Sequence, residues 1–293
     1  MLRRKTIRPG DEVAIVAPAG PFPRNRYERG REVLTRRGYR VVELLPPEAR
    51  RYLAASDEAR AAALTEAFSR PELRAVFAAR GGYGTMRILP SVDWSMAAAS
   101  GKPLVGFSDL TAVHLTLQRE GVRSVHGPVV TRLGEEPPDA LDRLFAILQS
   151  KEAPPPLQGR IVVPGEAEGR LVGGNLSLIT RLLGTPYLPS LRGAILLVEE
   201  VGERPYRLDR MWTHLRLAGV LDEIAGVAVG DLTDCAEPRG GHGAAEVMDE
   251  LLLELGKPAI AGLPIGHGEV HQAVVLGART RLQAGALVQL EGL

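Results

Sequence analysis

Short apolar runs alternate with helix-like segments through the first half of the chain. The runs have the length of buried strands, and the segments between them repeat apolar residues every three or four positions. The expected strands cover residues 13–16, 39–44, 75–78, 104–107 and 124–126, and the expected helices cover 24–37, 56–69, 109–119 and 138–149. Strands that alternate with helices in this way predict an α/β fold, with βαβ units around a buried, mostly parallel sheet.

The pattern breaks at residues 150–158, where three consecutive prolines stand in a stretch without periodicity. Such a stretch is typical of a linker, so we expect domains at residues 1–152 and 158–293. In the second domain the expected strands cover 160–163, 169–172, 194–198 and 226–229, and the expected helices cover 175–183, 208–218 and 244–255. The tail at 273–290 alternates only in part, which indicates a hairpin or a barrel-like edge.

Composition mainly excludes classes of protein. Of the 293 residues, 45% are hydrophobic and 24% are charged, as in ordinary globular proteins. A formal net charge of +1 does not predict a nucleic-acid partner. Cys235 is the single cysteine, so no disulfide can form within the chain. We expect no metal, because no spacing of His, Asp and Glu suggests ligands on one element, and a cytoplasmic location, because no signal peptide or membrane span is seen.

The stretch around Ser108 carries the strongest chemical signal. An apolar strand ends at this serine, and a helical pattern begins directly after it. A tight bend between strand and helix exposes the hydroxyl of a serine, and the amide of Asp109 can then face a developing oxyanion. The alternative is that Ser108 is only a helix N-cap, with Asp109 as a first-turn acid. The second glycine of the usual hydrolase elbow is missing, which weakens the analogy with that motif.

Candidates for the partners of this serine lie in the second half of the chain. Glu199 and Glu200 follow a buried strand, where open parallel sheets form their sites, and strand alternation sends the two side chains to opposite faces. His267 lies between two glycines in a loop, where a histidine can act as a base. His271 is its nearest competitor, and His126 stands at another strand end. The structural alternatives are an ordinary strand end for the glutamates and, for His267 taken alone, the favoured one of a surface-loop residue without a catalytic role.

A glycine-rich segment, residues 80–84, follows the third expected strand. Its glycines allow the backbone to approach a ligand closely, and Arg80 can hold a carboxylate through two hydrogen bonds. We therefore expect Arg80 and Tyr83 to contact substrate. The segment is not a phosphate-binding P-loop, because no Gly-Lys-Ser/Thr follows it. It also lacks the Gly-x-Gly-x-x-Gly spacing of a dinucleotide-binding fingerprint.

These segments, in their order and number, resemble the LD-carboxypeptidase family of serine peptidases, which includes the microcin C immunity hydrolases. The resemblance covers nearly the whole chain. It is carried by residues 10–19, 80–84, 106–111, 126–128, 173–177, 198–203, 205–210 and 263–268. It implies a three-layer N-terminal α/β domain, a smaller C-terminal α/β domain with barrel-like strands, a site between the two, and a homodimer.

The resemblance also implies a triad of Ser108, Glu199 and His267, with no cofactor. Glu200 is the less favoured choice for the acid, because this position varies in the family. The implied oxyanion hole uses the amide of Asp109 together with that of a glycine, either Gly81 or Gly82.

The resemblance implies that the protein releases terminal D-alanine from a murein tetrapeptide, in peptidoglycan recycling. The expected partner is therefore a small peptide, and neither a nucleic acid nor a membrane is expected. Two alternatives remain open. One is a microcin-type hydrolase of aminoacyl-nucleotide amides, which needs an aromatic side chain to stack on adenine, and Trp94 and Trp212 are the only tryptophans. The other is a non-catalytic module that binds peptidoglycan fragments.

Overall fold

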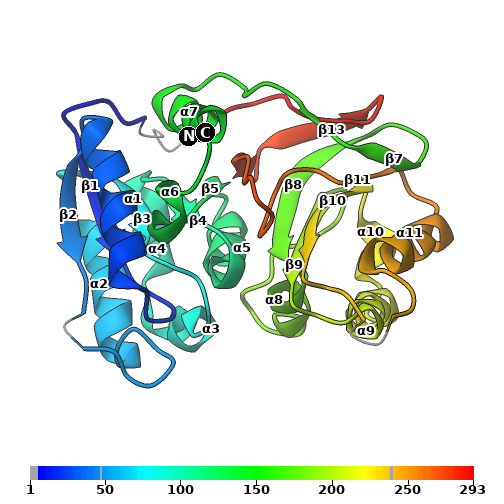
Figure 1. The fold of residues 1–293 in the computed structure, drawn as a ribbon, viewed down its shortest axis with the longest axis horizontal. Helices are drawn as coiled ribbons and strands as arrows, with labels where there is room; N and C mark the ends of the chain where they lie inside the picture. Colours follow the sequence, from blue (N-terminus) through cyan, green and yellow to red (C-terminus); the bar gives the residue numbers. More distant parts are fainter. Residues whose placement is uncertain (1–5, 47, 238–239) are drawn as a thin grey trace.

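A computed structural model describes residues 6–46, 48–237 and 240–293 of the chain. It contains a six-stranded and an eight-stranded β-sheet, each covered by helices, which lie beside one another (Figure 1). Within the described ranges, no helix is long and apolar enough to cross a membrane. The expected α/β fold with two domains of different architecture is confirmed.

The first sheet is parallel over five strands from the N-terminal half. These are β1 (Glu12–Val16), β2 (Arg40–Leu44), β3 (Leu73–Ala78), β4 (Leu104–Gly106) and β5 (Ser124–His126). The spatial order is β12-β5-β4-β3-β1-β2, and the register places Val13 of β1 between Val41 and Ala75. All five parallel strands therefore end at the same edge, where the loops that follow them meet.

Helices cover both faces of this sheet and make it a three-layer domain. Side chains of β1 alternate between two cores: Val13 and Ile15 pack on one face, and Ala14 and Val16 on the other. The first face carries α1 (Arg24–Arg36), α6 (Val130–Leu133) and α7 (Pro138–Gln149). The second face carries α2 (Asp57–Ser69), α4 (Trp94–Ser100) and α5 (Thr111–Arg119), with the short α3 (Thr85–Ile88) nearby.

The second sheet combines a parallel centre with antiparallel flanks. Its strands are β6 (Leu157–Gln158), β7 (Arg160–Val163), β8 (Ala167–Asn175), β9 (Ile195–Val201), β10 (Gly226–Thr233), β11 (Ala259–Ala261), β13 (Arg279–Gln283) and β14 (Ala286–Gln289). The order is β6-β14-β13-β8-β9-β10-β11-β7, so the two edge strands are β6 and β7. Only Gly159 separates these edges along the chain, which requires the sheet to curl until it is nearly closed.

Four helices pack against the second sheet. They are α8 (Leu176–Arg181), α9 (Pro205–Leu217), α10 (Val220–Glu223) and α11 (Ala244–Leu255), and Figure 1 shows them gathered on one side of it. Trp212 of α9 and Leu252 of α11 pack with Leu196 of β9. Helix α9 begins three residues before the expected start at 208, because Pro205 suits the first turn of a helix, where no backbone donor is needed.

Strand β12 (Val274–Leu276) comes from the C-terminal half and nevertheless joins the N-terminal sheet, antiparallel to β5. Val275 packs into the core of the first domain, whereas Val274 and Leu276 pack into the core beneath the second sheet. The hairpin expected in the tail is confirmed for β13 and β14. The first part of that tail instead links the two domains.

Candidate active site

Ser108 stands on a strained bend at the carboxyl end of β4. Its φ of +64° lies in the left-handed region, and a 3₁₀ turn, Ser108–Leu110, follows before α5 begins. A non-glycine residue in this region costs on the order of 1–3 kcal/mol, and the surrounding fold must hold it there. Two glycines make room for the bend: a Cβ on Gly106 would lie 2.9 Å from Leu110, and one on Gly81 would lie 2.9 Å from the Cβ of Ser108. The bend therefore has the shape of a strand-to-helix elbow, formed without the usual second glycine.

The loop between β11 and β12 brings His267 to this serine. The Nε2 atom of His267 lies 3.0 Å from the Oγ of Ser108, although 159 positions separate them in the chain. Both side chains are half-buried and so remain reachable from solvent. This distance is within the range for direct proton transfer between a nucleophile and a base.

Glu199 lies on the other side of the imidazole. Its Oε2 is 2.6 Å from the Nδ1 of His267, and the carboxylate is fully buried. Ser108, His267 and Glu199 thus form one continuous hydrogen-bonded chain. A buried acid at Nδ1 fixes the tautomer in which Nε2 is free to accept a proton.

Glu200 points to the opposite face of β9, as strand alternation predicts. Its carboxylate accepts hydrogen bonds from the Asn175 side chain at 2.8 Å and from the backbone amides of Ser177 and Val201 at 2.8 and 2.9 Å. Burial raises the pKa of this carboxyl group, and the three donors oppose that rise. Glu200 therefore holds the turn into α8 and does not contact His267.

The two competing histidines lie behind the site. Nδ1 of His126 and Nε2 of His271 are 3.0 Å apart, and both rings are fully buried. Burial lowers the pKa of both well below the ordinary value, so they stay neutral. The ring of Phe107 separates His271 from His267, with centroid distances of 4.5 and 4.7 Å. The pair packs against the ring of Phe107, whereas the hydrogen bond of Ser108 goes to His267.

The glycine-rich loop lies directly beside Ser108. A Cβ on Gly81 would point at the serine side chain, whereas one on Gly82 would point at Gly20. Arg80 is exposed, and its Nη1 donates to the carbonyl oxygen of Pro21 at 2.5 Å. Of the two candidate glycines, Gly81 is therefore the closer neighbour of the serine.

The side chain of Asp109 ties the elbow to the next turn of structure. The carboxylate of Asp109 accepts a hydrogen bond from the amide of Thr85 at 2.8 Å. The backbone carbonyl oxygen of Asp109 accepts one from the Thr85 hydroxyl at 2.6 Å. Burial raises the pKa of the Asp109 carboxyl group. Asp109 thus fixes the turn that contains Ser108 to the first residue of α3.

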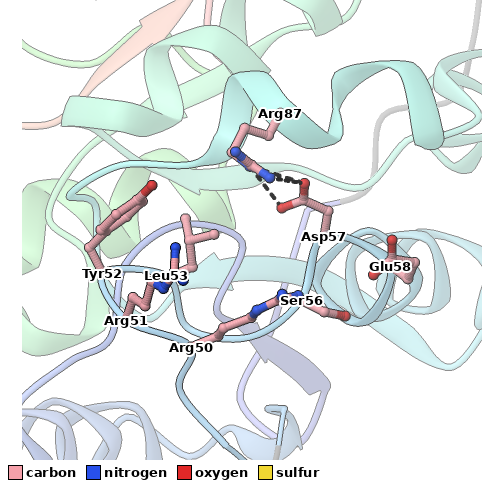
Figure 2. Close-up of a pocket in the computed structure, with 8 residues that line it drawn as sticks. All are labelled: Arg50, Arg51, Tyr52, Leu53, Ser56, Asp57, Glu58 and Arg87. Atoms are coloured by element: carbon pink, nitrogen blue, oxygen red, sulfur yellow. Dashed lines mark hydrogen bonds and ion pairs between the residues drawn. The ribbon is translucent and has the colours of Figure 1, made fainter.

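Tyr83 leads from this loop to a hollow lined largely by charged residues. Its ring is 49% exposed and meets the ring of Tyr52 edge to face, with centroids 5.7 Å apart. Figure 2 shows the hollow, of about 230 Å³, where Arg87 is paired with Asp57. Arg87 is held by Asp57, whereas both rings of the tyrosine pair are exposed.

Sequence patterns left two supporting residues unnoticed. The sequence pattern identifies Phe107 only as the end of a strand, whereas its ring lies between His267 and the buried histidines. Asp231 accepts a hydrogen bond from the amide of Gly268 at 3.1 Å. Its position just beyond the expected strand 226–229 is the same signal that singled out Glu199, so the pattern could have revealed it.

Gly266→Ala is expected to lower kcat at least tenfold. An added Cβ would lie 2.8 Å from the Oε2 of Glu199, and φ at Gly266 is +128°, so the acid would be displaced from His267. Gly262→Ala is the matched control, since Gly262 also has positive φ (+73°) but faces open space. Steady-state kinetics of both variants test this expectation, and equal activity would contradict it.

The family model for the LD-carboxypeptidase N-terminal domain matches residues 13–127, and the model for the C-terminal domain matches residues 168–282. The chain belongs to the LD-carboxypeptidase family. The family match and the relatives named as carboxypeptidases show that this chain is a serine-type carboxypeptidase, a hydrolase.

Individual relatives of this LD-carboxypeptidase cover almost its full length. The murein tetrapeptide carboxypeptidase of Pseudomonas aeruginosa is 33% identical over 288 residues, with 94% of each chain covered. The crystal structure of a muramoyltetrapeptide carboxypeptidase from Oxalobacter formigenes is 31% identical, with a TM-score of 0.86 and coverage of 96% of this chain and 99% of that one. The microcin C7 self-immunity protein MccF of Escherichia coli is 26% identical, over 90% of this chain and 87% of its own.

Proposed function

We propose that the chain cleaves the L,D-peptide bond of a murein tetrapeptide and releases the terminal D-alanine. The observation that carries this proposal is the chain of hydrogen bonds from Ser108 through His267 to Glu199 across two domains. The two relatives named as tetrapeptide carboxypeptidases, both above 30% identity, support the substrate class.

In the proposed mechanism, the Oγ of Ser108 attacks the scissile carbonyl carbon while Nε2 of His267 accepts the hydroxyl proton. Glu199 stabilises the imidazolium that forms. His267 then gives this proton to the nitrogen of the departing D-alanine, which leaves an acyl ester on Ser108. A water molecule, deprotonated by His267, attacks the ester, and the proton returns to Ser108 as the shortened peptide departs.

The oxyanion formed at each tetrahedral step needs donors on the opposite side of the carbonyl from His267. We assign this role to the amides of Asp109 and Gly81, because the elbow and the glycine-rich loop both meet Ser108. Gly82 is the less favoured candidate, since its Cα faces Gly20. Arg80 retains further N–H donors beyond the one used by Pro21, and we propose that they hold the free carboxylate of the D-alanine.

A second candidate is hydrolysis of an aminoacyl-nucleotide amide. The relationship to MccF favours it, and so does the exposed pair of Tyr52 and Tyr83, which offers a surface for stacking. Trp94 and Trp212 do not offer one, because both are buried in the core. We therefore place this activity second.

Direct competition between the two substrates tests the choice. We expect kcat/KM for D-alanine release from the tetrapeptide to exceed that for cleavage of an aminoacyl sulfamoyl adenosine by at least about 100-fold. Chromatography of both reactions measures it. The reverse order would transfer the assignment to the nucleotide amide.

A non-catalytic binding module is the remaining alternative. The strained serine and its hydrogen bond to a histidine would have no purpose in such a module, and they support the hydrolase instead. Covalent labelling of Ser108 by a fluorophosphonate is expected, and peptide binding without labelling would favour the module.

With the substrate proposed here, the enzyme would act in cytoplasmic recycling of peptidoglycan peptides, as a homodimer.

A further inference from the structure

The loop that carries His267 is attached to both domains. On the side of its own domain, the amide of Gly268 donates to the carboxylate of Asp231 in β10 at 3.1 Å. On the side of the N-terminal domain, the carbonyl oxygens of Gly268 and Glu269 accept hydrogen bonds from Nη2 of Arg132, at 2.8 and 3.3 Å. The amide and the carbonyl group of Gly268, the residue that follows the catalytic histidine, are thus bound by different domains.

Glu136 completes the attachment to the N-terminal domain. Its Oε2 accepts a hydrogen bond from the amide of His271 at 2.9 Å, and its Oε1 lies 2.8 Å from Nη2 of Arg132. The side chain of Glu136 is fully buried and that of Arg132 is 17% exposed. Because Glu136 is fully buried and Arg132 is mostly buried, water competes little for either group, and this favours a single geometry of the ion pair.

The segment that carries Arg132 and Glu136 is packed closely against the N-terminal domain. The amide of Thr131 in α6 donates to the carbonyl oxygen of Ala79 at the end of β3. Gly30 of α1 packs so closely on α6 that a Cβ there would lie 1.7 Å from the carbonyl oxygen of Val130. The guanidinium of Arg132 also lies 5.9 Å from the centre of the Phe107 ring, next to the nucleophile. The pair is therefore anchored in the same domain as Ser108.

We propose that Arg132 and Glu136 are positioning residues that set the distance between His267 and Ser108 across the domain boundary. The inference rests on the proposed catalytic role of His267, but not on the identity of the substrate. Each domain supplies one reacting group, so some contact between them must fix the relative position of the two. A displacement of about 1 Å at a reacting group can lower a rate about 100-fold.

The double variant Arg132→Met/Glu136→Gln tests the proposal without leaving a buried charge unpaired. We expect kcat to fall about 10- to 100-fold while KM stays within twofold, since neither side chain is assigned a contact with substrate. The rate of Ser108 labelling by a fluorophosphonate should fall to a similar extent. Arg132→Lys keeps the charge beside Glu136 and should recover part of both rates.

Glu135→Gln is the matched control. Glu135 is the neighbour of Glu136 in the chain, but its carboxylate pairs with Arg26 and Arg29 on the surface. This variant should match the wild type in kcat and in labelling. If the double variant does not fold, Glu136→Gln alone serves, because it keeps an acceptor for His271 and removes the charge that orients Arg132. It should slow labelling at least threefold.

The labelling experiment separates this proposal from the proposed substrate. Wild-type protein that is labelled but releases no D-alanine would overturn the substrate assignment and still allow the positioning role to be scored. A folded double variant labelled within twofold of the wild-type rate would overturn the role of Arg132 and Glu136. Wild-type protein that resists labelling would overturn the nucleophile, and with it the need for positioning.

Discussion

Ser108→Ala is expected to lower the rate of D-alanine release by a factor of at least about 10⁴, because the acyl-enzyme can no longer form. The fold should survive the change. Alanine has the same Cβ as serine, and the left-handed conformation at this position is imposed by the neighbouring glycines and the 3₁₀ turn. The measurement is single-turnover release of D-alanine, with circular dichroism to confirm the fold.

Ser69→Ala is a suitable control, since Ser69 lies at the exposed end of α2 and its hydroxyl donates to the carbonyl oxygen of Glu66 in the preceding turn. It should retain full activity. Substantial turnover by purified Ser108→Ala would remove the serine from the mechanism, whatever the role of the rest of the site.

Glu199→Gln is expected to lower kcat by about 10³, with little change in KM. The glutamine amide can donate a hydrogen bond to Nδ1 of His267, which favours the tautomer whose Nε2 carries a proton. That tautomer cannot accept the proton of Ser108. Because position 199 is fully buried, water cannot take the place of the lost carboxylate beside His267, and this increases the loss of kcat. Pre-steady-state kinetics should show slow acylation.

Glu200→Gln provides the comparison, because Glu200 is the adjacent residue and is also buried. It should lower the midpoint of thermal unfolding, through the weakened bonds to Asn175 and Ser177, and leave kcat within about threefold of the wild-type value. If the kinetic loss occurred in Glu200→Gln and not in Glu199→Gln, the assignment of the acid would have to be exchanged.

Local patterns predicted much of this arrangement, for reasons that the structure makes clear. Apolar periodicity located the strands because most of them are buried on both faces. Ser56 caps α2 because its Oγ accepts a hydrogen bond from the amide of Ala59, as its position at the start of the expected helix suggests. The alternation of Glu199 and Glu200 followed from the two-residue period of a strand. These features depend on near neighbours in the chain.

Features that depend on distant partners could not be predicted in this way. Helices α3, α4, α6 and α10 are too short for a periodic signal. The pairing of β12 with β5 joins residues about 150 positions apart, and nothing in the three apolar residues of β12 identifies the sheet that receives them. The same is true of the contact between Arg132 and the His267 loop.

The place of β12 has a consequence for biosynthesis. The first sheet receives its edge strand only after residue 276 of 293 has left the ribosome. Until then the backbone groups on one side of β5 have no partner, and such an unpaired edge invites association with other chains. We expect truncated nascent chains that stop before β12 to aggregate, and the finished enzyme to fold as one cooperative unit.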